Sequence, residues 1–124
     1  MRALTQTGHA LFDAQVLPSL TGGDATLVEE LLAAYRISAR DTAQSLSKAQ
    51  ASANWRQVGE LAHRLKSSSR SVGAMQLGEI CAALEQAGRN QDGDRIPGLA
   101  GDLAAALDAA AHRMTEPQTT DSAG

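Results

Sequence analysis

The sequence has few of the residues that build the most recognisable sites in proteins. Its 124 residues include one cysteine, three prolines and three aromatic side chains. Because Cys81 stands alone, an intramolecular disulfide and any metal motif made of several cysteines are excluded, and the chain suits a reducing setting. No stretch approaches the roughly 20 apolar residues of a membrane span, and residues 1–8 are too polar for a signal peptide. A cytoplasmic chain without membrane contact is therefore expected.

Charge and composition narrow the class of protein further. The net charge is −3, and stacking aromatics are missing, so nucleic-acid binding is not expected. Alanine and leucine dominate while β-branched residues are sparse, which favours helices. The length suits one domain, which we place at residues 1–114. Residues 115–124 are mostly small or polar and predict a disordered tail or the remnant of a linker.

Five helices are expected, over residues 8–17, 25–50, 55–73, 74–87 and 97–114. Asp24 and Asn54 are good N-caps for the second and third helices, and Pro18 follows the first. Gly73 and Gly88 close the third and fourth. Four amphipathic helices with short connections predict an all-α fold, an antiparallel up-and-down four-helix bundle with a short extra N-terminal helix capping one end. The third and fourth helices should form a hairpin around Gly73.

Apolar side chains at helical spacing predict the core. Cys81 lies between Leu77 and Leu84 on one face of the fourth helix and is expected to be a small core residue. The second helix has an apolar stripe that weakens toward its C-terminal half, and the fifth helix has a shorter one. The stripe of the second helix is Leu27, Leu31, Ala34 or Tyr35, Ser38, Thr42 and Leu46, and that of the fifth is Leu99, Leu103, Leu107 or Ala106, and Ala110.

His63 stands out because it points away from the predicted core. On a helical wheel for the third helix, at about 100° per residue, the apolar residues share less than a third of the circumference. These residues are Val58, Leu61, Leu65 and Val72. His63 lies almost opposite them, so its imidazole should face water. Its neighbours one or two turns away are Gly59, Glu60, Lys66, Ser67, Arg56 and Arg70.

The surroundings of His63 predict a site for an anion. Imidazole titrates close to neutral pH, so a good fraction is neutral and can attack phosphorus. Lys66 follows on the same face, and Glu60 is placed to accept a hydrogen bond from one ring nitrogen and leave the other free. Four cations and one anion lie within residues 55–73, so this face is locally positive. A glycine inside a helix is unfavourable, and the close approach of another protein would explain Gly59.

These residues form a recognisable motif. The segment His63-Arg64-Leu65-Lys66-Ser67-Ser68-Ser69, followed by Val72-Gly73-Ala74, resembles the signature of the histidine-containing phosphotransfer (HPt) family. That signature is roughly A-H-x-L-K-G-S/A-S/A, then a hydrophobic residue, G and A, and Ser67 departs from it where the family usually has glycine. The resemblance extends over residues 10–112. Its further positions are Phe12-Asp13, Val16-Leu17, Leu20, Gly22-Gly23-Asp24, Leu31-Leu32, Asn54-Trp55, Cys81 and Leu84-Glu85.

The resemblance implies a phosphorelay intermediate of two-component signalling without kinase activity of its own. By that resemblance, His63 accepts a phosphoryl group from an aspartyl phosphate on a response-regulator receiver domain and passes it to another receiver, and Lys66 stabilises the phosphoryl group. The implied partners are receiver domains and a hybrid sensor histidine kinase. The receiver supplies the aspartate and Mg²⁺, so no cofactor or metal is expected in this chain, which we expect to be a monomer. The docking face is assigned to Gly59, Ser67, Arg70 and Arg56, and orientation of the imidazole to Glu60.

Other functions are open at this point. A protein-interaction module would dock a receiver or another regulator through the same helix face, although such a scaffold needs neither His63 nor Lys66. A solvated histidine without a role is the plainest alternative. A helical adaptor would expose an apolar stripe, and none is clearly left over. A di-iron site is disfavoured because Glu60-Leu61-Ala62-His63 is a lone Glu-x-x-His motif that points outward among cations.

The remaining histidines lie far from the motif in the sequence. His9 and His112 are expected at the surface, and His112 is placed to pair with Asp108 one turn earlier.

Overall fold

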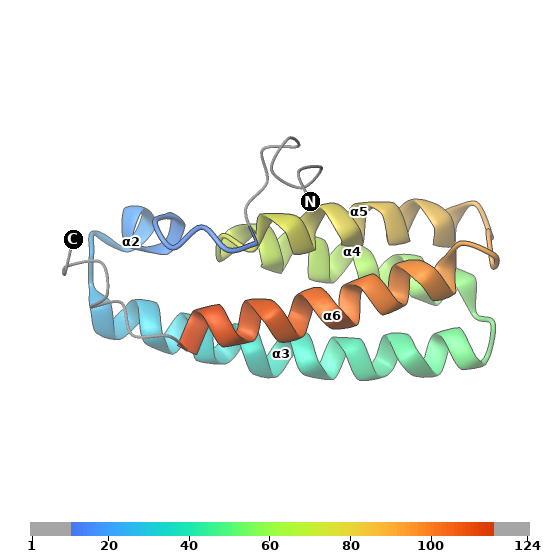
Figure 1. Ribbon diagram of the computed structural model, residues 1–124, viewed down its shortest axis with the longest axis horizontal. Coiled ribbons are helices and arrows are strands. Elements are labelled where there is room, and N and C mark those ends of the chain that lie inside the picture. The colour runs from blue at the N-terminus through green and yellow to red at the C-terminus, as the bar shows by residue number, and fades with distance from the viewer. Residues whose placement is uncertain (1–10, 116–124) are drawn as a thin grey trace.

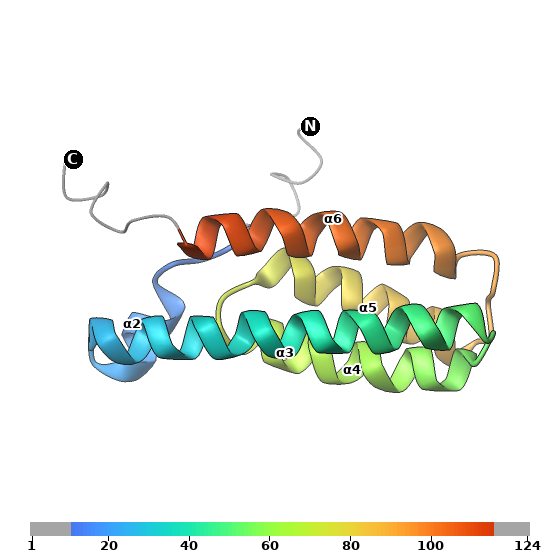
Figure 2. The same ribbon diagram turned by 90° about the horizontal axis from the view of Figure 1, so that it is seen from below.

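The structure, a computed structural model, describes residues 11–115 of the chain. Most of these residues lie in five helices, α2 (Val16–Thr21), α3 (Ala25–Ala51), α4 (Trp55–Ser71), α5 (Met75–Arg89) and α6 (Ile96–Thr115). The four long helices lie side by side and run alternately in opposite directions, and α2 packs beside the start of α3 at one end (Figures 1 and 2). The predicted all-α bundle with a short extra helix is therefore confirmed. No helix within residues 11–115 is long and apolar enough to cross a membrane.

The predicted N-caps begin two of the helices. The Asp24 carboxylate accepts a hydrogen bond from the Leu27 N–H at 3.1 Å, and the Asn54 side-chain oxygen accepts one from the Gln57 N–H at 3.2 Å. The Gln57 side-chain oxygen in turn accepts a hydrogen bond from the Asn54 side-chain amide at 3.2 Å. Because each cap supplies an acceptor to an otherwise unpaired N–H, α3 and α4 begin where the sequence places them.

Gly73 makes the predicted hairpin between α4 and α5. Its φ of 94° lies in the left-handed region that favours glycine. Its carbonyl oxygen accepts a hydrogen bond from the Asp13 N–H at 2.7 Å, and a Cβ at Gly73 would collide with the Asp13 carbonyl. The turn thus joins α4 to α5 and also fastens the segment before α2.

The core is densest between α4 and α5. The predicted inner face of α4 is confirmed, since Val58, Leu61, Leu65 and Val72 are all buried. Cys81 is fully buried in the facing helix, and this burial raises the pKa of its thiol to about 12, which keeps it protonated at neutral pH. A buried hydrogen bond of 2.6 Å between the Tyr35 and Ser69 hydroxyls links α3 to α4. Within the described residues no buried side-chain nitrogen or oxygen lacks a partner.

The first helix does not lie where the sequence predicts it. Residues 11–15 are not helical, α2 begins at Val16, and Pro18 lies inside its first turn instead of after its end. Proline is tolerated in a first turn because the N–H it lacks has no partner there. Before the helix, the Asp13 carboxylate accepts a hydrogen bond from the Gln15 N–H at 3.0 Å and holds a turn. Residues 8–10 of the predicted helix lie outside the described residues.

The predicted stripe of α3 is wrong at Leu27, Leu31 and Ser38. Leu27 and Leu31 are 39% and 38% exposed, and Ser38 is also exposed. Tyr35 and Leu46 of the predicted stripe are buried, and Leu32, Ala39 and Ala49 complete the buried face. At 27 residues α3 is ten residues longer than α4, and its first turns extend beyond the end of α6 (Figure 1). α3 also contacts the short α2.

The end of α5 also differs from the prediction, whereas the stripe of α6 does not. Gly88 lies inside α5, which continues to Arg89, and the positive φ that follows belongs to Gln91. In α6 the predicted face is confirmed, with Leu103, Ala106 and Ala110 buried and Leu99 and Leu107 packed against the core.

Candidate functional site

His63 lies in the middle of α4 on the outer surface of the bundle. Its side chain is 57% exposed, and the wheel prediction of a solvent-facing imidazole is confirmed. The ring is held on one side only, where Nδ1 lies 3.0 Å from Oε2 of Glu85 on α5. A carboxylate can only accept, so in the neutral ring Nδ1 carries the hydrogen and Nε2 keeps an unshared electron pair. The ring is thereby oriented with its basic nitrogen free.

Glu85 is the centre of a small network of charges. Its side chain is only 6% exposed. Oε1 lies 2.7 Å from the Lys66 ammonium, and Oε2 lies 2.6 Å from the Arg89 guanidinium in addition to its contact with His63. The hydrogen bond from Lys66 holds the pKa of the Glu85 carboxyl below its ordinary value, burial opposes this, and the hydrogen bond from His63 adds to it. Glu85 therefore stays ionised although it is buried.

Glu60 does not orient the imidazole, contrary to the prediction. It is 61% exposed, and its carboxylate lies 3.5 Å from the Arg56 guanidinium one turn earlier on α4. Both residues lie on the exposed face of α4, so the pair is a solvated contact within one helix. The acceptor for the His63 ring comes from the neighbouring helix instead.

Gly59 lies where α4 packs against α5. A Cβ on Gly88 would lie 2.7 Å from the Gly59 nitrogen and 2.8 Å from its Cα, while a Cβ on Gly59 would lie 3.4 Å from the Glu85 carbonyl oxygen. The two glycines mark the place where the backbones of α4 and α5 pass closest. This close approach requires glycine at position 88, whereas a Cβ on Gly59 would make only ordinary contacts. The approach also brings Glu85 within reach of His63.

Ser67 and Arg70 lie further along α4. Ser67 is exposed, and its carbonyl accepts a hydrogen bond from the Ser71 hydroxyl at 2.9 Å. Arg70 extends over Gly78 of α5 and pairs with Glu79 at 3.2 Å. Arg70 is thus directed along the seam between α4 and α5, and it makes its ion pair away from the ring.

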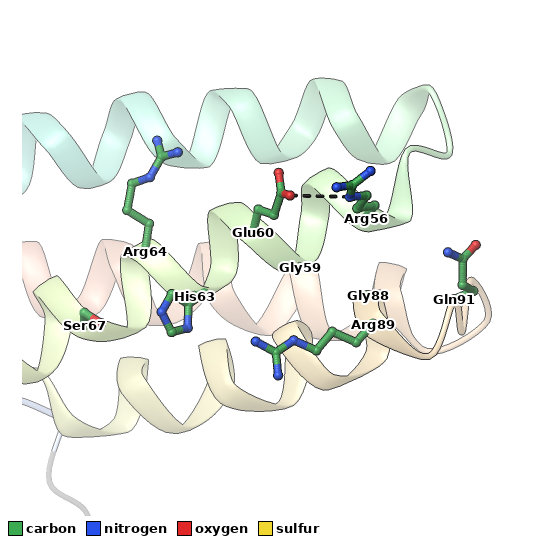
Figure 3. A pocket seen from close by; sticks show the side chains of 9 residues that line it. All are labelled: Arg56, Gly59, Glu60, His63, Arg64, Ser67, Gly88, Arg89 and Gln91. Carbon is green, nitrogen blue, oxygen red and sulfur yellow. Dashed lines mark ion pairs between the residues drawn. The ribbon is translucent and has the colours of Figure 1, made fainter.

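An open pocket of about 740 Å³ lies beside His63. Figure 3 shows the Arg89 side chain extending from α5 toward His63, whereas Arg64 points toward α3 and away from the ring. The pocket walls come from α4 and from the end of α5, and the lining residues are Arg56, Gly59, Glu60, His63, Arg64, Ser67, Gly88, Arg89 and Gln91. Three arginines and one carboxylate in the lining suit an anionic group.

Two residues of this site, Glu85 and Arg89, carry no role in the prediction from sequence. Glu85 follows Leu84 and stands four residues after Cys81, at the border of the apolar face of α5. An acidic side chain at such a border needs a partner when the helix packs, and this is the signal that would have found it. Arg89 is one turn further along the same helix, where an ion pair with Glu85 is favoured.

The other candidate groups lie elsewhere. His112 is exposed on α6, with Nδ1 2.9 Å from the Asp108 carbonyl and 3.9 Å from its carboxylate, so the predicted pair with Asp108 is present. His9 lies outside the described residues. Within residues 11–115, no group of three or more His, Cys, Asp and Glu side chains could hold a metal ion.

Comparison with known proteins agrees with this geometry. The model of the Hpt domain family matches residues 30–114. The chain belongs to the Hpt domain family. Curated relatives of this Hpt domain include the virulence sensor protein BvgS of Bordetella parapertussis, 34% identical over 98 residues, and that of Bordetella pertussis, 33% identical over 96. The matches cover 77% and 76% of this chain and 8% of each relative, so the Hpt domain spans a small part of their length.

A solved structure has the same fold. The histidine-containing phosphotransfer protein B (HptB) of Pseudomonas aeruginosa PAO1 superposes with a TM-score of 0.79 at 23% sequence identity, over 84% of this chain and 90% of that chain. The bundle is therefore the fold of a known phosphotransfer protein. Membership of the Hpt family supports phosphotransfer in phosphorelay signalling as the general role of the chain.

Proposed function

We propose that His63 receives a phosphoryl group from an aspartyl phosphate on a receiver domain and passes it to a second receiver. The observation that carries this proposal is that Glu85 contacts only one ring nitrogen of His63, with Nδ1 3.0 Å from the carboxylate. The side chain is 57% exposed and lines the open pocket. The free Nε2 is the nucleophile. Its electron pair forms the bond to phosphorus, the bond between phosphorus and the aspartyl oxygen breaks, and that electron pair returns to the aspartate as carboxylate.

Both this chain and the receiver supply positive charge that balances the negative charge of the transferred phosphoryl group. Lys66 lies one turn after His63 and shares Glu85 with it, so its ammonium is close enough to move to a phosphoryl oxygen on the ring. Arg89 reaches the same place from α5 (Figure 3). The aspartate and Mg²⁺ are assigned to the receiver domain, and this chain needs no metal and no kinase activity of its own. The exposed residues Arg56, Ser67 and Arg70 shape the docking face around this point.

The proposed partners are receiver domains and the hybrid sensor kinase that supplies them. The relatives of this Hpt domain are virulence sensor proteins, which supports a sensor kinase upstream. The cytoplasm remains the proposed compartment. We also propose a monomer, because one exposed face of the bundle carries the described site.

The test is phosphotransfer from a panel of phosphorylated receiver domains, with Mg²⁺, to the wild type, His63→Gln and His112→Gln. His112 is the matched control, because it is an exposed histidine on α6 that pairs only locally. We expect label on the wild type and on the His112 variant but not on the His63 variant, and we expect acid to remove the label and alkali to leave it. Binding of receivers without any label would instead support an interaction module.

A further inference from the structure

The Glu85 carboxylate has more partners than orientation of a ring requires. Within 3.0 Å it contacts the His63 ring, the Lys66 ammonium and the Arg89 guanidinium. All three are groups that a phosphoryl group on His63 would also involve. A neutral acceptor would hold Nδ1 in the same orientation, so the negative charge itself calls for an explanation.

We propose that the negative charge of Glu85 limits the lifetime of the phosphoryl group on His63, so that this Hpt domain passes phosphate on quickly instead of storing it. The inference rests on the proposed function only in taking His63 as the phosphoacceptor. Glu85 acts through the ring and through two cations, and it is a positioning residue that does not contact the transferred group.

The first effect acts through the ring. A ring with phosphorus on Nε2 can lose the hydrogen on Nδ1, and the carboxylate 3.0 Å from Nδ1 favours the form that keeps this hydrogen more strongly than a neutral acceptor would. When the bond between nitrogen and phosphorus breaks, its electron pair stays on Nε2 and the phosphoryl group goes to water or to an aspartate. The ring then leaves as neutral imidazole with its hydrogen already on Nδ1, which is the form it had before. No proton has to move, and leaving is easier than it is for an imidazolate.

The second effect acts through the cations. A phosphoryl group carries close to two negative charges at neutral pH, and Lys66 and Arg89 are the cations nearest to it. The Glu85 carboxylate pairs with Lys66 at 2.7 Å and with Arg89 at 2.6 Å, so it competes with the phosphoryl oxygens for these two cations. Its negative charge also repels the phosphoryl oxygens directly. Removing the charge of Glu85 frees both cations. The two effects therefore act in the same direction.

The experiment loads His63 without a receiver. Phosphoramidate, a small phosphoryl donor, transfers its group to Nε2 and releases ammonia, so the outcome does not depend on whether a receiver phosphorylates the chain. The half-life of the phosphohistidine is then measured at neutral pH by ³¹P NMR for the wild type, Glu85→Gln, Glu79→Gln and Arg89→Gln. Glu79 is the matched control, because it is a carboxylate on the same helix that pairs with Arg70.

Glutamine keeps an acceptor for Nδ1 but removes the charge. We expect Glu85→Gln to lengthen the half-life by about fivefold, the order of magnitude expected when a charge-assisted hydrogen bond becomes a neutral one. Glu79→Gln should match the wild type. Arg89→Gln should shorten the half-life, because Arg89 offsets the charge of Glu85, and its 66% exposed side chain can be replaced without disturbing the core.

Ring ¹⁵N chemical shifts of the unphosphorylated proteins separate this role from a structural one. Hydrogen should remain on Nδ1 in the wild type and in Glu85→Gln, and should lose that preference in Glu85→Ala. An unchanged or shorter half-life in Glu85→Gln, a longer one in Arg89→Gln, or no loading by phosphoramidate at all would overturn the inference. Loading by phosphoramidate but by no receiver would overturn the proposed function and leave the half-lives to decide on Glu85.

Discussion

At the scale of single residues, the site depends on a buried charge that is fully paired. Burying an ionised carboxylate is costly unless it is paired and hydrogen-bonded, and Glu85 has a partner on each oxygen. Two of these partners, His63 and Lys66, come from the facing helix. The same interactions that make the burial tolerable also orient the imidazole, so stability and reactivity are coupled at this residue.

Acid should weaken the fold through Glu85. Since the pKa of its carboxyl lies below the ordinary value of 4.5, it binds fewer protons in the folded chain than in the unfolded one. Its stabilisation is therefore present above pH 4.5 and is lost as pH falls through the lowered pKa. Urea unfolding of the wild type and Glu85→Gln at several pH values should give a difference in free energy of unfolding that shrinks below pH 4.5. A difference that grows on acidification would contradict this assignment.

The exposed half of the site could be predicted from sequence, and the buried half could not. The exposure of His63 and the place of Lys66 follow from the period of a single helix. Glu85 is 22 residues away from His63, and its contact exists only because α4 and α5 cross closely. Glu60 satisfies the spacing rule for an acceptor on α4, but Arg56, at i−4 of Glu60, pairs with it instead.

At the scale of elements, helix starts were predictable where a side chain makes the cap. Asp24 and Asn54 do so locally, and both predictions hold. The start of α2 was not predictable, because Asp13 is bound to Gly73 on a segment 60 residues later. The prediction misplaced part of the buried face of α3 for a similar reason. The lengths of the neighbouring helices decide which turns of α3 have a packing partner.

The crossing of α4 and α5 should not tolerate a methyl group at Gly88. The Cβ of Gly88→Ala would lie within 2.8 Å of backbone atoms of Gly59 and Trp55, and backbone cannot move aside as a side chain can. We expect a loss of about 1–3 kcal/mol from overpacking, reduced by up to about 1 kcal/mol from the better helix propensity of alanine.

The matched control for this substitution is Gly101→Ala. Gly101 is an exposed residue of α6 with nothing within 4 Å of its missing Cβ, so alanine there should stabilise the fold by roughly 0.5–1 kcal/mol. Thermal unfolding measures both variants. The Gly88 variant should also slow labelling of His63, because moving α5 outward lengthens the contact with Glu85. Equal stability of the two variants would show that the crossing is not tight.

At the scale of the whole molecule, the bundle is unevenly packed. The fully buried side chains are concentrated on α4, on α5 and in the turn between them, among them Ala62, Leu77, Cys81, Leu84 and Ala87. The end of the bundle where α2 meets the first turns of α3 leaves Leu20, Leu27 and Leu31 substantially exposed. The fold class follows from composition and helix count, whereas this unevenness follows from helix lengths and the glycine crossing, which become visible only in three dimensions.

Hydrogen exchange should reveal this gradient. Amides open locally with a free energy that follows how much apolar surface covers them, so those of residues 77–87 in α5 and 58–65 in α4 should exchange last, near the rate of global unfolding. Amides of α2 and of residues 25–31 should exchange much earlier, through local opening. The order matters for function, because the helix pair that holds His63 and Glu85 would then stay rigid while α2 and the first turns of α3 move. Uniform exchange of all five helices would mean that the bundle opens only as a whole, and that the α4–α5 pair has no separate rigidity with which to hold the imidazole.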